Sequence, residues 1–96
     1  MTKKQIEQIC ELAIRRFGRE SQIKKIQEEC LELALAISRK DCETKQLEDT
    51  TFQIYDEIAD VTIMMIMAQV VYDGKRIQER VNLKLAAFKK KYLKEL

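Results

Sequence analysis

The sequence has no proline, no histidine and no tryptophan, and it has only two glycines, Gly18 and Gly74. No segment alternates β-branched and polar residues between turn signals, so strands are not indicated. Lys, Glu, Leu, Ile, Ala and Gln dominate instead, and most of these residues favour helices. The composition therefore predicts an all-α protein.

The missing histidines and the few cysteines also limit the metal chemistry. Cys10, Cys30 and Cys42 form no Cys-x-x-Cys pair, so a structural zinc site lacks a ligand set. A di-iron carboxylate bundle needs Glu-x-x-His pairs, which this chain cannot supply. Reduced thiols are typical of the cytoplasm, where we expect the protein to be located.

A strong net charge and a long apolar run are lacking too. The chain has 18 basic and 16 acidic residues and a net charge of +2, which argues against a nucleic-acid polymer as partner. The most apolar stretch, residues 61–71, contains Gln69 and is too short to span a bilayer. No signal peptide is visible, and we expect no membrane partner.

The chain does contain four stretches with apolar residues at helical spacing, and its length predicts one domain over residues 1–96. Gly18 is expected to end the first helix, with Ser21 as N-cap of the second and Thr50 as N-cap of the third. The charged segment 40–49 is the expected long loop. The third helix is apolar nearly all round in its second half. These features predict a four-helix antiparallel bundle-like protomer, completed by assembly into a homodimer or homotetramer.

Two acidic segments place carboxylates on helix faces that should be buried. In IQEECLELA, residues 26–34, Glu29 shares the face of its apolar neighbours, and Glu32 follows one turn later. In YDEIADV, residues 55–61, Glu57 and Asp60 repeat this arrangement. If the two helices are neighbours, the four carboxylates converge.

Such convergence would be costly without a partner. Two like charges about 5 Å apart repel by roughly 3 kcal/mol at an effective dielectric near 20, whereas a whole domain is stable by only about 5–15 kcal/mol. A divalent cation removes this cost, and ligation by oxygen alone suits Mg²⁺ or Mn²⁺. In the alternative interpretation, the acids are solvated and the chain is a non-catalytic helical interaction or oligomerisation module.

A basic residue follows on the expected inner face of the last helix. Lys84 lies three residues after Val81 and four before Phe88. A cation opposite an acidic metal site suits a polyphosphate that spans the two. Asn82 lies nearby and carries an amide that can donate to a phosphate or to a base edge.

Together these motifs resemble the signature of a known family. EECLE at 28–32, followed by EIAD at 57–60, is similar to the EExxE…ExxD signature of the MazG-like all-α nucleoside triphosphate pyrophosphohydrolases, which are related to the dimeric dUTPases. NLKL at 82–85 resembles the Asn-x-Lys segment of their last helix, and the likeness covers roughly residues 12–90. The chain departs from the family at 86–88, where Ala-Ala-Phe stands in place of frequent arginines.

The resemblance implies a Mg²⁺-dependent enzyme that hydrolyses a nucleoside triphosphate to the monophosphate and pyrophosphate. It implies that the metal ligands are Glu29, Glu32, Glu57 and Asp60. Glu28 would be a further ligand or the base that takes the proton of the attacking water. The residues implied to bind the nucleotide are Gln22, Asn82 and Lys84.

Overall fold

The computed structural model describes the backbone of residues 1–42 and 47–96, and the side chains of residues 1–39 and 53–96. Over these ranges the chain forms four α-helices and no strand: α1 Lys3–Phe17, α2 Arg19–Cys42, α3 Leu47–Val71 and α4 Gly74–Tyr92. The predicted all-α class is confirmed. No helix within these ranges is long and apolar enough to cross a membrane.

The junction between α1 and α2 is a single glycine. Helix α1 begins with a capping box, in which the Thr2 hydroxyl accepts from Gln5 N and the Gln5 side chain accepts from Thr2 N. Gly18 ends α1 with a φ of +91°, as expected, and α2 restarts at Arg19. The prediction of Ser21 as N-cap is therefore wrong, because the positive φ of Gly18 makes the turn without further residues.

The segment between α2 and α3 is shorter than expected. Both helices extend into residues 40–49, and residues 43–46 lie outside the described part. Helix α3 begins at Leu47, so the prediction of Thr50 as its N-cap is wrong. Residues 47–50 contain neither proline nor glycine, so nothing in the sequence stops the helix there.

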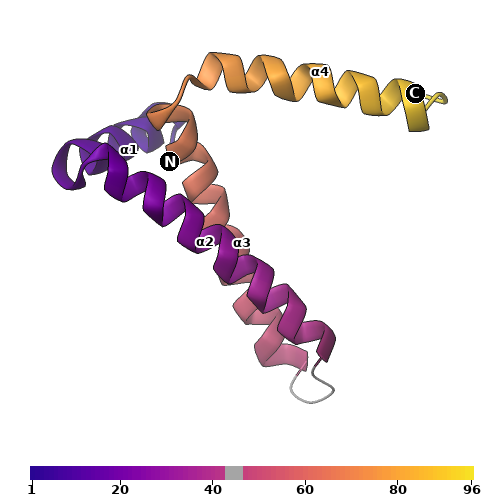
Figure 1. Cartoon of the computed structure of the whole chain (residues 1–96), viewed down its shortest axis with the longest axis horizontal. Helices are drawn as coiled ribbons and strands as arrows, with labels where there is room; N and C mark the ends of the chain where they lie inside the picture. The colour runs from indigo at the N-terminus through magenta and orange to yellow at the C-terminus, as the bar shows by residue number, and fades with distance from the viewer. Residues whose placement is uncertain (43–46) are drawn as a thin grey trace.

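Helices α2 and α3 lie side by side as a long antiparallel pair, and α1 packs across one end of it (Figure 1). The core at this end is small. It consists of Cys10 from α1 with Met64 and Met67 from α3, surrounded by half-buried aliphatic side chains such as Ile14 and Ile26. Cys10 is only 2 % exposed, so this thiol serves as a small apolar core residue.

Helix α4 takes a different course. Asp73 caps it by accepting from the backbone N–H groups of Lys75 and Arg76, and residues 72–73 form the turn between α3 and α4. From there α4 runs away from the α2–α3 pair, and the chain forms a V (Figure 1). Within the described ranges α4 packs against α3 alone, and none of its own residues is buried. We refer to α1–α3 as the packed unit and to α4 as the arm.

Candidate metal centre

The two acidic segments meet where α2 and α3 lie side by side. Glu29 on α2, and Glu57 and Asp60 on α3, each place one carboxylate oxygen within 4.8 Å of the other two. Helical spacing puts Glu57 and Asp60 one turn apart on the same side of α3. The antiparallel pairing then brings them opposite Glu29. Three of the four ligands proposed from the sequence therefore converge.

The two glutamates of this cluster are only partly exposed. One oxygen of each, Oε2, is buried and has no hydrogen-bond partner among the described residues. The side chain of Glu29 is 14 % exposed, and its ion pair with Lys25 is long, at 4.0 Å. Buried carboxylate oxygens are normally satisfied by a donor or a cation. These two oxygens therefore lack the donor or cation that usually accompanies a buried carboxylate oxygen.

Burial and neighbouring acids raise the pKa of both Glu29 and Glu57 above the usual glutamate range. For Glu29 burial is the largest cause, followed by the negative charges of Glu32 and Asp60, while Lys25 acts in the opposite direction. For Glu57 burial again comes first, followed by the same two acids. The ionised cluster is self-repelling, and a cation would relieve that repulsion.

The other two acids of the first motif lie on the exposed side of α2. Glu32 is not one of the three converging carboxylates, but its charge raises the pKa of both Glu29 and Glu57. Glu28, the candidate base, is exposed and lies about 100° around the helix from Glu29. The structure thus places Glu32 beside the cluster and Glu28 at its edge.

The candidate substrate contacts are divided between the two parts of the chain. Gln22 is buried on α2, two turns before Glu29. Asn82 and Lys84 are exposed on the arm, where Asn82 accepts a hydrogen bond from Gln78 at 3.1 Å. Because the arm runs away from the α2–α3 pair, the structure does not bring Asn82 and Lys84 to the carboxylates within one chain. Helical periodicity predicts the side of a helix on which a residue lies, and not the direction of the helix.

The basic side chain next to the cluster, Lys25, was not predicted from the sequence. Lys25 lies one turn before Glu29, and this i,i+4 spacing was a readable signal for their ion pair. A hollow of about 820 Å³ lies elsewhere, between α1, the end of α3 and the start of the arm. Its lining includes Glu7, Val70 and Gln78 but none of the three converging acids. The candidate centre lies between α2 and α3, with Asp60 exposed and the two glutamates partly exposed.

Comparison with known proteins does not assign the site. No protein-family model, no curated protein and no solved structure matches the chain. The likeness to the MazG-like enzymes therefore depends on the ordered motifs EExxE, ExxD and Asn-x-Lys, and it stays a prediction.

Proposed function

We propose that the chain binds Mg²⁺ or Mn²⁺ through Glu29, Glu57 and Asp60, and that it is a metal-dependent nucleoside triphosphate pyrophosphohydrolase. The observation that supports the metal site is the convergence of three carboxylates from two helices, two of them with a buried unpaired oxygen. The order of the acidic motifs, which resembles that of the MazG-like enzymes, supports the substrate class.

We assign the residues roles that combine the resemblance with their positions. When bound, the ion would neutralise phosphate oxygens and acidify a water molecule. Glu29, Glu57 and Asp60 hold the ion, and Glu32 adds negative charge beside them. Glu28 faces solvent at the edge of the cluster, where it takes or orients the proton of the attacking water. The water oxygen bonds to phosphorus as the anhydride bond between the α- and β-phosphates breaks. This yields the monophosphate and pyrophosphate.

We further propose that the protein is a cytoplasmic homo-oligomer. The free thiols of Cys10 and Cys30 are consistent with a reducing compartment. Large apolar side chains remain exposed on α3 and on the arm, which a monomer of this size would not leave uncovered. Gln22 is the candidate substrate contact on the same helix as Glu29, whereas Asn82 and Lys84 would have to reach the cluster from another subunit.

One observation favours a second candidate function. The arm carries exposed apolar residues along its length and contributes no side chain to the acidic cluster, as expected of an interaction helix. In this alternative the chain is a helical oligomerisation module, and the carboxylates bind no ion.

The deciding experiment compares metal binding and hydrolysis in the same samples. Chain freed of metal by a chelator is melted with and without Mg²⁺, and pyrophosphate release is measured on a panel of nucleoside triphosphates. The matched variants are Glu57→Gln in the cluster and Glu79→Gln on the arm. An ion at a hundredfold excess over its dissociation constant stabilises the folded state by about 2.7 kcal/mol. We expect this stabilisation and the activity in the wild type and in Glu79→Gln, and their loss in Glu57→Gln.

The two readouts separate the two functions. A melting temperature that Mg²⁺ does not raise would contradict the metal site and favour the interaction module. Stabilisation by Mg²⁺ without pyrophosphate release from any nucleotide would contradict the enzyme and leave a metal site without hydrolysis.

A further inference from the structure

The chain exposes far more surface than a compact monomer of its mass. Its accessible surface is 8155 Å², whereas a folded protein of 11.3 kDa exposes about 5,700 Å². The radius of gyration, 16.7 Å, likewise exceeds the roughly 12.5 Å of a globular domain of this length. The excess of about 2,400 Å² is comparable to what one subunit of an obligate homodimer buries, about 1,000–2,500 Å².

Part of this surface is an apolar seam on α3. Its residues recur at alternating steps of four and three, which is the spacing of a coiled-coil contact face: Ile54, Ile58, Val61, Met65 and Ala68, followed by Tyr72 directly after the helix. Met65, Ile58 and Tyr72 are 41, 46 and 49 % exposed. Packing within the chain therefore leaves this α3 seam half uncovered.

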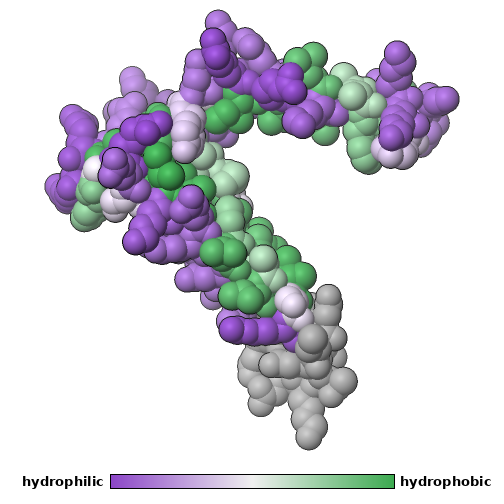
Figure 2. All heavy atoms as spheres, in the orientation of Figure 1, coloured by the Kyte–Doolittle hydropathy of each residue, from purple (hydrophilic) through white to green (hydrophobic). Residues whose placement is uncertain are grey.

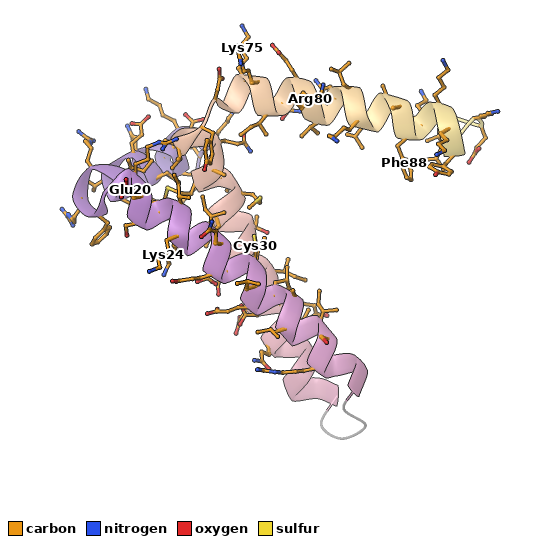
Figure 3. The ribbon with its side chains drawn as sticks, viewed as in Figure 1. Glu20, Lys24, Cys30, Lys75, Arg80 and Phe88 are labelled. Atoms are coloured by element: carbon orange, nitrogen blue, oxygen red, sulfur yellow. The ribbon has the colours of Figure 1, made fainter. Side chains whose placement is uncertain are left out.

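The arm carries a second seam of the same kind. Its residues follow steps of four, three and four, and all are exposed: Val81, Leu85, Phe88 and Tyr92. Apolar side chains gather on the sides of the arm and of the α2–α3 pair that face each other across the V (Figure 2). Phe88 points toward this inner side, while Lys75 points away from it (Figure 3). The arm seam and an apolar side of the α2–α3 pair therefore face the same open space.

The charges of the two helices are complementary. Residues 47–71, which form α3, include five acidic residues and no basic one. Residues 74–92, which form the arm, include seven basic residues and one acidic one. An anionic membrane would attract the arm but repel α3, and it would leave the α3 seam uncovered. A second copy of the chain supplies an acidic apolar face for the arm and a basic apolar helix for α3.

We propose that two copies of this chain exchange arms, so that the arm of each protomer packs along the α3 seam of its partner. A two-fold axis makes the exchange reciprocal, and both seams of both chains are covered. At about 100° per residue, Asp60 lies about 120° around α3 from the middle of the seam, and Glu57 lies about 60° from it. The exchange therefore places the partner's arm beside the candidate metal centre, on the side of Glu57. This inference rests on the homo-oligomer of the proposed function and not on the metal or the reaction.

The first test is the mass of matched variants in solution, measured by sedimentation equilibrium at micromolar concentration. Leu85→Glu changes the arm seam, and Leu83→Glu changes a leucine of equal exposure on the other side of the arm (62 and 60 % exposed). We expect the wild type and Leu83→Glu to be dimeric, or an even multiple of dimers. In Leu85→Glu and Met65→Glu, the dissociation constant of the dimer should be at least tenfold higher. Circular dichroism checks that each variant keeps its helices.

The second test identifies which surfaces touch. In a Cys30→Ser/Cys42→Ser background, with Cys10 left buried, one chain carries Phe88→Cys and a differently tagged chain carries Met65→Cys. A bismaleimide should join the two different chains. A second pair of chains, one with Leu85→Cys and the other with Ile58→Cys, tests the same contact at other positions of the two helices.

Each remaining outcome overturns the proposal. A monomeric wild type, or equal dissociation of Leu83→Glu and Leu85→Glu, contradicts the dimer interface. Cross-linked products that contain only two chains with the same tag contradict arm exchange. A double variant, Met65→Cys/Phe88→Cys, that closes within one chain would show that the arm covers its own α3. Recruitment of monomers to anionic vesicles would favour a membrane instead. None of these readouts depends on Mg²⁺ or hydrolysis, so they fail independently of the proposed activity.

Discussion

The packed unit and the arm are both helical, but different interactions hold them. Helices α1–α3 bury Cys10, Met64 and Met67 between them, whereas no residue of the arm is buried. The arm has an N-cap at Asp73 and a last turn of three lysines that complements the helix dipole. Most of the stability of helices in proteins comes from tertiary packing, and such packing buries no residue of this 19-residue helix. The packed unit is therefore held by a core of its own, whereas the arm has none.

The largest effect should come from the core of the packed unit. Met67 is 4 % exposed, and truncating a buried methionine to alanine costs about 2–5 kcal/mol. We expect Met67→Ala to lower the free energy of unfolding by that amount in urea titrations followed by circular dichroism. Leu83→Ala on the arm should change it by less than about 0.5 kcal/mol. Equal losses in the two variants would contradict the division into a packed unit and an arm.

The next effect concerns the turn that joins α1 to α2. Gly18 has a φ of +91°, and a Cβ there would meet no atom within 4 Å. The cost of Gly18→Ala is therefore backbone strain alone, about 1–3 kcal/mol. Ser21→Ala is the matched control, because Ser21 lies inside α2 and caps nothing. We expect it to be neutral or slightly stabilising, and a loss of about 1 kcal/mol would instead indicate a cap.

Helix content, the end of α1 and the acidic faces could be predicted from the sequence, because each depends on residues a few positions apart. The convergence of Glu29, Glu57 and Asp60 could be predicted too, because it depends only on their spacing along each helix and on the pairing of α2 with α3. The course of the arm could not be predicted in this way. It depends on the turn at 72–73 and on surfaces that one chain leaves uncovered, and Lys84 therefore lies far from its expected place.

Loss of either N-cap, Thr2 of α1 or Asp73 of α4, should reduce stability by a similar amount but in different parts of the chain. Loss of a cap costs about 1 kcal/mol. Thr2→Ala should lower the stability of the whole packed unit, because α1 contributes Cys10 to the core. Asp73→Ala should leave the unfolding midpoint of the packed unit unchanged and speed amide hydrogen exchange in the first turn of the arm. The measurement is hydrogen exchange resolved by peptide, in the dissociated variant Leu85→Glu. Faster exchange throughout α2 and α3 in Asp73→Ala would contradict this separation.

The smallest effect is the pH dependence that the acidic cluster adds to the packed unit. Burial and acidic neighbours raise the pKa of Glu29 and Glu57 in the folded chain. Between the unfolded value, about 4.3, and the raised folded value, the folded state binds more protons than the unfolded state. Stability from these groups is therefore fully present below the unfolded pKa and is lost as pH rises through the folded pKa.

We expect chain held in a chelator to melt at a lower temperature as the pH is raised from about 4 to 7. This decline should be shallower in Glu57→Gln, which removes one of the two groups, and unchanged in Glu79→Gln on the arm. Mg²⁺ should flatten the decline in the wild type, because an ion that binds the ionised cluster offsets its repulsion. An identical decline in Glu57→Gln and the wild type would mean that the two carboxylates are not coupled, and that the packed unit differs from the arm in its core alone.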